Sequence, residues 1–157
     1  MPRFMRKGKT KIFFVPTIAS LSAPTAVEIN AGTQLDTQLA EINGFEFTNT
    51  AIDTPDMASS FVSKIPGEDT VGDSNMTFYQ LSGTTNPISL ALAKNAVGYV
   101  VLFHEGIAGA LPAASDKCDI WPVIVASNSK RYTVANEAAQ YQVVFTNTAA
   151  PTAGVLA

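Results

Sequence analysis

Two apolar stretches, Val97–His104 (VGYVVLFH) and Lys117–Ser127 (KCDIWPVIVAS), decide the fold of this chain. Both are rich in valine, isoleucine and aromatic residues, which favour β-strands. Residues 105–116 between them contain Gly, Ala and Pro, which is typical of a loop. The pattern therefore predicts an outgoing strand, a loop and a return strand that pair as an antiparallel hairpin.

Further strands are predicted on either side of this pair. The first is Lys9–Val15, which Pro16 ends. The others are 39–52 with a bulge or bend at Gly44, 76–81, and 138–146, and a short strand through Phe61, Ser63 and Ile65 lies within an otherwise turn-rich segment.

Helices are few and short in this reading. Thr25 and Glu28 are spaced as a capping box, and Gly32 stands where a C-terminal cap would, so residues 26–31 form one short helix. Asn86 as N-cap and Pro87 at the first position begin a second, which ends near 94–95. We therefore predict a single mainly β domain over 1–157, an antiparallel β-sandwich or part-open barrel with one short flanking helix.

Composition narrows the function classes. The 157 residues are 46% hydrophobic and 15% charged, which excludes a disordered chain. One Cys and one His exclude a disulfide framework and a zinc site built from those residues. No apolar run approaches the ~20 residues of a membrane span, and Pro16 interrupts the apolar stretch after the basic start too early for a signal peptide. We expect a protein made and kept in a cytoplasm.

The net charge of −3 hides an uneven distribution. Five cations lie in residues 1–11, a basic N-terminal arm, before any acidic residue; the rest of the chain has five basic residues against thirteen acidic ones. A basic arm on an acidic body suggests that the arm meets an acidic surface on a neighbour, although a solvated tail is the plainer alternative. Few aromatic residues accompany the cations, which disfavours a surface for nucleic-acid stacking.

No catalytic, metal or cofactor site is predicted. His104 is the only His, and no Gly-x-Ser-x-Gly motif exists in the chain. If His104 lies opposite Lys117 in the predicted hairpin, Cys118 lies opposite Phe103 and faces away from His104, as a buried small hydrophobe. Neighbouring carboxylates most simply form a solvated or lumen-facing acidic surface rather than an acid–base pair. The glycines after His104 lack the spacing of a nucleotide-binding loop. Trp121 is interpreted as a core or interface anchor.

The order and spacing of several segments resemble the tail tube (major tail) proteins of long-tailed bacteriophages. These segments are 9–16 (KTKIFFVP), 24–33 (PTAVEINAGT), 40–45 (AEINGF), 53–70 (from DTPD to KIPGEDT), 76–79 (MTFY), 86–87 (NP) and 118–123 (CDIWPV). The resemblance covers most of 9–146, whereas the C-terminal tail 148–157 carries no motif. It implies a virion subunit whose sandwich forms hexameric rings, which stack into a tube that conducts the genome, in a tail without a contractile sheath.

The resemblance also implies partners: other copies of the chain, and the tail terminator, tape-measure and distal tail proteins. DNA would pass through without specific binding, since an acidic body repels phosphate. The protein would reside in the virion tail after assembly in the host cytoplasm. The alternatives are another virion β-sandwich, such as a head–tail connector or decoration protein, or a monomeric ligand-binding β-sandwich module.

Residues 53–75 form a long acidic segment, which the resemblance places between neighbouring subunits and stacked rings. Loops of this length usually mean function or partner contact. We expect it to be an inter-subunit loop whose acids meet the basic arm of a neighbour. Which residues face the lumen is left open, but the expected inter-subunit contacts are Arg3, Phe4, Arg6, Lys7, Asp53, Asp56, Met57, Phe61, Ile65, Glu68, Asp69 and Asp73.

Overall fold

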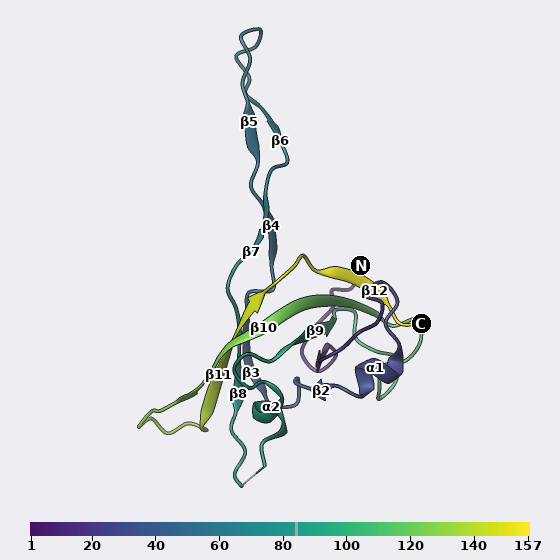
Figure 1. Cartoon of the computed structure of the whole chain (residues 1–157), viewed down its shortest axis with the longest axis vertical. Helices are drawn as coiled ribbons and strands as arrows, with labels where there is room; N and C mark the ends of the chain where they lie inside the picture. Colours follow the sequence, from purple (N-terminus) through teal and green to yellow (C-terminus); the bar gives the residue numbers. More distant parts are fainter. Residues whose placement is uncertain (84) are drawn as a thin grey trace.

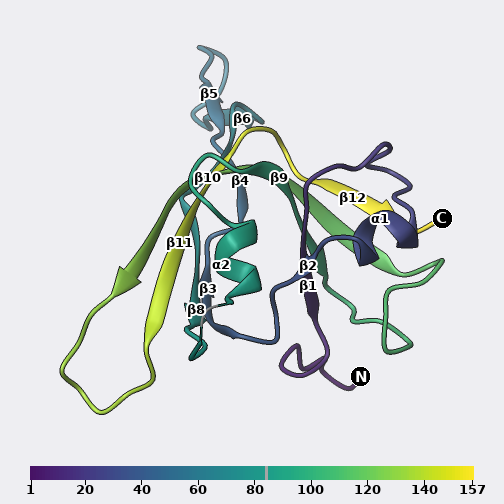
Figure 2. The ribbon, with the colours of Figure 1, turned by 60° about the horizontal axis from the view of Figure 1, so that its bottom comes forward.

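The computed structural model describes residues 1–83 and 85–157, and its longest strand, β10 (Lys117–Arg131), organises the molecule. The first part of β10 pairs with β9 (Val97–Phe103), and its second half pairs with β11 (Gln140–Asn147). A bulge between Val125 and Ser127 interrupts the register on the β11 side. The sheet therefore bends around β10, and its two parts diverge from this strand (Figure 2).

The remaining strands extend this sheet at both ends, and every pairing is antiparallel. The strand order is β2-β1-β9-β10-β11-β8-β3, which confirms the predicted mainly β antiparallel sandwich. β12 pairs with the first part of β10 on the edge opposite β9, and so continues the line of β11. The bounds are β1 Lys11–Val15, β2 Thr33–Gln34, β3 Leu39–Asn43, β8 Ser74–Tyr79 and β12 Thr152–Val155.

Two hydrophobic cores lie on opposite faces of β1, β9 and β10. Ile12 and Phe14 of β1 belong to the larger core, whereas Phe13 and Val15 belong to the smaller one. Helix α2 (Pro87–Ala91) contributes to the larger core, and α1 (Ala26–Asn30) contributes to the smaller one. A strand that is buried on both faces reads as a continuous apolar run, which explains why the sequence of β1 does not alternate.

Both short helices are present where the sequence predicts them. The capping box of α1 is confirmed: Glu28 N–H donates to Thr25 Oγ1 at 3.3 Å, and Thr25 N–H donates to Glu28 Oε2 at 3.0 Å. Asn86 is the N-cap of α2 and Pro87 opens the helix, as predicted, but the Asn86 side chain makes no capping hydrogen bond. The helix also ends earlier than predicted, at Ala91, because its C-cap Leu92 leaves the helical conformation with φ −100° and ψ 40°.

The predicted strand over 39–52 and the loop over 53–75 are wrong in their boundaries. Gly44 and Phe45 have φ angles of 78° and 56°, so the chain leaves the sheet after β3. Residues 46–73 then form a two-stranded projection, hereafter the ribbon (Figure 1). Only the strand predicted near Ser63–Ile65 keeps its place. The strands of the ribbon are β4 Phe47–Asn49, β5 Ile52–Thr54, β6 Ser63–Ile65 and β7 Asp69–Val71, paired as β4 with β7 and β5 with β6.

The C-terminal tail carries more structure than its sequence indicates. Residues Thr152–Val155 form β12, in register with Lys117–Ile120 of β10, and Leu156 is buried in the smaller core. Its own chain therefore orders this tail. Among the described residues, no helix has the length and apolar character needed to cross a membrane.

Candidate functional site

The base of the ribbon is anchored in the larger core. Phe45 packs edge-on against Trp121 with ring centroids 5.6 Å apart, and its N–H donates to Ser74 Oγ at 3.0 Å. Asn147 Nδ2 donates to the same hydroxyl at 2.9 Å. Trp121 is thus a core residue, one of the two roles the sequence left open. A Cβ on Gly44 would lie 2.5 Å from the carbonyl oxygen of Asp73, so the exit of the ribbon requires glycine.

Polar cross-strand pairs hold the ribbon together along its length. Thr48 and Thr70 hydroxyls lie 3.1 Å apart, and Thr54 and Ser63 hydroxyls lie 2.9 Å apart. Lys64 Nζ lies 3.1 Å from Asp53 Oδ1. Each such exposed pair contributes at most about 1 kcal/mol, and an isolated two-stranded hairpin is marginally stable in water.

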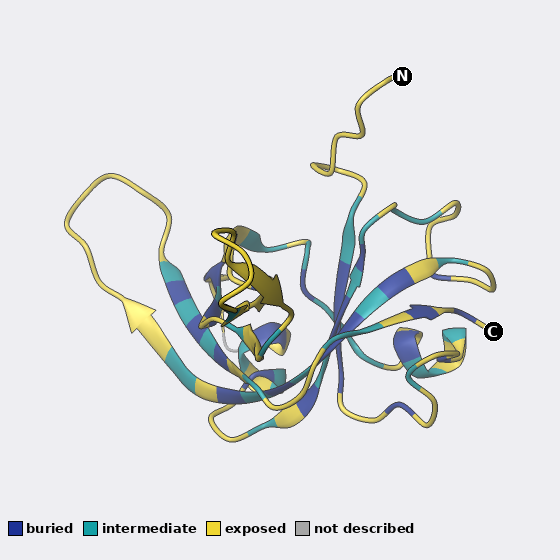
Figure 3. Ribbon diagram, turned by 90° about the horizontal axis from the view of Figure 1, so that it is seen from above, coloured by how far each residue is buried: buried dark blue, intermediate teal, exposed yellow. Residues whose placement is uncertain are grey.

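The ribbon exposes apolar side chains that find no core in their own subunit. Met57 and Phe61, near its apex, expose 104% and 75% of their reference surface. Ile52 and Ile65, paired across β5 and β6, expose 52% and 50%, and most of the projection is coloured as exposed in Figure 3. Exposed large apolar residues of this kind make the ribbon a candidate interaction surface.

Asp56 shapes the apex of the ribbon. Its Oδ1 accepts the N–H groups of Ala58 and Ser59 at 2.8 and 3.0 Å, and Ser59 Oγ accepts the N–H of Phe61 at 3.0 Å. These bonds fold the chain back between β5 and β6, so Met57 and Phe61 are presented at a defined turn.

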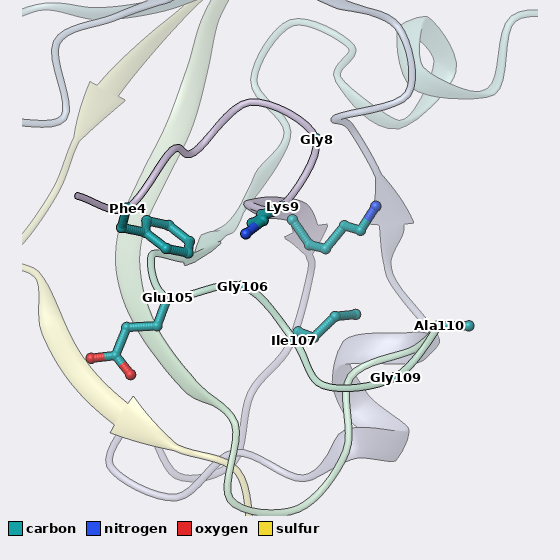
Figure 4. A pocket seen from close by; sticks show the side chains of 9 residues that line it. Phe4, Gly8, Lys9, Glu105, Gly106, Ile107, Gly109 and Ala110 are labelled. Carbon is teal, nitrogen blue, oxygen red and sulfur yellow. The ribbon is translucent and has the colours of Figure 1, made fainter. Parts of the chain in front are cut away.

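The N-terminal arm is exposed but is not uniformly free. Lys11 is part of β1, and its Nζ lies 3.6 Å from Asp36 Oδ2 of the same chain. Lys9 Nζ lies 5.7 Å from the centre of the Phe4 ring, at a hollow of about 680 Å³ that the arm forms with the loop after β9 (Figure 4). Arg3, Arg6 and Lys7 form no ion pair with any described residue.

The residues tested for catalysis do not form a nucleophile–base pair. Cys118 lies opposite Phe103, following the observed register of Asp119 with Leu102, and is fully buried, as predicted. Its Sγ lies 3.7 Å from the carbonyl oxygen of Gly154, and burial, with Asp119 second, raises the pKa of the thiol to about 11. His104 instead lies 3.4 Å from Asp119 at the surface. The described residues contain no group of three His, Cys, Asp or Glu that could hold a metal ion.

The loop between β10 and β11 was not singled out from the sequence. Lys130 and Arg131 end β10, and Tyr132 and Val134 follow with 91% and 108% of their reference surface exposed. Two adjacent cations before Tyr132 are a pattern that the sequence contains. Because the predicted strand ends at Ser127, these residues fell in a connection to which no role was assigned.

The structure separates the predicted contact residues into two groups. Arg3, Phe4, Arg6 and Lys7 lie on the arm, whereas the acidic and apolar residues from Asp53 to Asp73 lie on the ribbon. No described ion pair joins the two groups within the subunit.

The chain thus combines a bent antiparallel sandwich with a projecting ribbon that exposes apolar side chains. The family model described as Phage tail tube protein matches residues 1–157, and this chain belongs to that family. It is therefore a structural subunit of a phage-type tail, located in the virion tail. No curated protein matches the sequence.

Solved structures share the fold at low sequence identity. The sheath/tube terminator of an extracellular contractile injection system (PVC, extended state) aligns with a TM-score of 0.65 at 10% identity, covering 98% of both chains. The tube terminating cap of the anti-feeding prophage gives 0.62 at 11%, covering 99% of this chain and 93% of that one. The tail of an empty GTA particle gives 0.53 at 10%, covering 96% and 98%. At these identities the likeness establishes the fold alone.

Proposed function

We propose that six copies of this chain close into a ring, and that the rings stack into a tube through which DNA passes. The observation that carries this proposal is a pair of open edges on one four-stranded unit, hereafter the inner sheet: β3, β8, β11 and residues 125–131 of β10. Two of the similar assemblies are titled as six-fold symmetric, the anti-feeding prophage baseplate and the GTA tail.

The two edges are suited to pair with each other between copies. On one side, β3 is bonded to β8 alone. On the other side, β9 pairs with β10 as far as Ile124, and the Val125 N–H still donates to Ala96 O at 2.9 Å, but residues 126–131 have only β11 as a strand partner. Because an even number of strands alternates in direction, β10 of one copy meets β3 of the next in antiparallel orientation. Such pairing removes both edges and closes the wall of a ring.

The face of the inner sheet that points away from the larger core supplies the wall of the channel. Asn43 Nδ2 donates to Glu41 Oε1 at 2.9 Å and to Asn75 Oδ1 at 3.3 Å on this face. Across the strands, Glu41, Thr77, Gln142 and Ser129 form one row, and Asn43, Asn75, Val144 and Ser127 form the next. These two rows are mostly neutral and contain no cation, so they offer phosphate no ion pair. The next row on the same face, Tyr79, Gln140 and Arg131, places one cation at the end of the sheet.

The arm and the ribbon supply further contacts between subunits in this proposal. Arg6 and Lys7 line a hollow with Leu39 and Ile42 of β3, which places the arm beside the open edge where a neighbour would join.

Deletion of residues 1–7 should leave a folded subunit that no longer polymerises. If the truncated protein forms tubes of normal length and stability, the arm is not an assembly element.

The finer parts of the proposal rest on the resemblance of the sequence to tail tube proteins. The subunit acts without enzymatic chemistry, is assembled in the host cytoplasm, meets a tail terminator, a tape-measure protein and a distal tail protein, and belongs to a tail without a contractile sheath. Replacing His104 and Cys118 with Ala should leave infectivity intact in virions with normal tubes. A contracted sheath in micrographs of the virion would contradict the assignment to a tail without a contractile sheath.

Electron microscopy of the purified protein at high concentration tests the proposal as a whole. The expected result is hollow tubes with six-fold symmetry. The variant Glu41→Lys should add positive charge to the channel wall and so retard the passage of DNA. Rings that never stack would indicate a head–tail connector, and a persistent monomer would indicate a binding module; either result would overturn the tube.

A further inference from the structure

The ribbon and the β10–β11 loop lie at opposite ends of the inner sheet. At one end, Ser74 of β8 pairs with Phe145 of β11 beside the exit of the ribbon. At the other end, Tyr79 pairs with Gln140, which pairs with Arg131. Figure 1 shows the same relation, with the ribbon at the top and the loop at the lower left. In the proposed tube, with the strands of the inner sheet running along its axis, these two ends of subunits in successive rings face each other.

The ribbon end is acidic and apolar. Residues 46–73 contain six acids and a single cation, Lys64, which is already paired with Asp53. Met57 and Phe61 stand exposed at the apex beside Asp56. Thirteen residue steps separate Glu46 from Ser59, so at ~3.3 Å per residue the ribbon reaches roughly 40 Å from the sheet.

The loop end has the complementary character. Lys130 and Arg131 are exposed and form no ion pair with a described residue. Tyr132 and Val134 expose nearly their whole side chains directly after these cations. Glu137 is the only acid between Arg131 and Gln140. Two cations beside two bare apolar side chains are what an acidic, apolar ribbon requires of an acceptor.

We propose that the ribbon of one subunit binds the β10–β11 loop of a second copy in the adjacent ring. This inference rests on the proposed stacking and names its contact. Met57 and Phe61 pack on Tyr132 and Val134, while the ribbon acids approach Lys130 and Arg131. The two surfaces differ, so the contact is head-to-tail and repeats without closing, as a growing tube requires.

The arm is the rival acceptor, because the sequence alone pairs the acidic segment with the basic arm. The structure favours the loop. Two of the five arm cations already have partners in their own chain, Lys9 over the Phe4 ring and Lys11 beside Asp36. Arg6 and Lys7 lie next to the open edge of β3 and so face a neighbour within the ring.

Cysteine cross-linking of assembled tubes distinguishes the two acceptors. The test protein is the full chain carrying Met57→Cys and Val134→Cys, both at fully exposed positions, and the matched rival carries Met57→Cys and Phe4→Cys. Met57→Cys alone is the control, since native Cys118 is buried. Tubes are oxidised, denatured without reductant and separated by electrophoresis.

The expected result is a ladder of covalent oligomers for the Met57→Cys, Val134→Cys pair that extends beyond six subunits, because contacts between rings have no closing step. The rival pair and the control should remain monomeric or dimeric. A ladder that stops at six, an equal ladder for the rival pair, or no ladder in well-formed tubes would overturn the proposed contact. If the unmodified chain forms no tubes, the proposed function itself fails, which is a separate result.

Discussion

The ribbon and the sandwich body differ in how far their side chains are buried. The body surrounds two cores in which residues such as Phe78, Phe103 and Phe145 are fully or almost fully buried. The ribbon is two strands wide, and it encloses no side chain beyond its base. The body therefore carries the stability of the subunit, whereas in the proposed tube the ribbon gains its order from neighbouring subunits. On this proposal, mutations should separate folding from assembly.

A buried aromatic residue and an exposed one should separate these roles most strongly. Phe145→Ala removes a ring that packs with Phe45 at 5.9 Å, and it should lower the free energy of unfolding by about 3–5 kcal/mol. Phe61→Ala on the ribbon should change it by less than about 0.5 kcal/mol yet reduce tube formation. Denaturant titration of the monomer and sedimentation of tubes measure the two effects. Equal losses of stability would contradict the division.

The junction between the two regions should show an intermediate effect. Gly44→Ala places a Cβ against the backbone of Asp73 in a residue with a φ of 78°, and should cost about 1–3 kcal/mol. Gly72→Ala is the matched control, because no atom lies within 4 Å of its added Cβ. Thermal unfolding of both variants gives the comparison, and an equal shift in Tm would mean that the exit of the ribbon is not constrained.

The body should also lose stability at alkaline pH. Burial raises the pKa of Cys118 to about 11 and that of Tyr141 to about 12. Both groups ionise first in the unfolded chain, so their contribution is fully present below about pH 9 and is lost as the pH rises through 11 to 12. The free energy of unfolding should fall by at most about 1.4 kcal/mol per pH unit for each of these two protons. Denaturant titration from pH 8 to 11.5 measures it, and an unchanged slope in Cys118→Ala would contradict the assignment.

The two regions also differ in how well their sequences predicted them. In the body, the hairpin of β9 and β10, the register at Cys118 and the capping box of α1 all follow from local patterns. Burial imposes these patterns on each stretch separately. The division of β1 between two cores could not be seen, because an unbroken run such as Ile12–Val15 does not say what covers each face.

The sequence predicts residues 53–75 as a contact segment, and this stays a prediction; the structure of the ribbon was not predicted. Its strands are three residues long and nearly all exposed, so no apolar alternation marks them. Two positive φ angles at Gly44 and Phe45 end β3, and only the glycine gave a signal. The β12 strand was missed for a related reason: small residues such as Ala153 and Gly154 join β10 through backbone bonds, which leave little trace in a sequence.

Hydrogen exchange compared between monomer and tube tests the central claim, that the body is stable alone and the ribbon is stabilised by its neighbours. Amides of residues 47–71 should exchange fast in the monomer and slowly in the tube, whereas amides of β9 and the first half of β10 should exchange slowly in both. Equal protection of residues 47–71 in the two states would contradict the account, because the ribbon would then be stable within its own subunit.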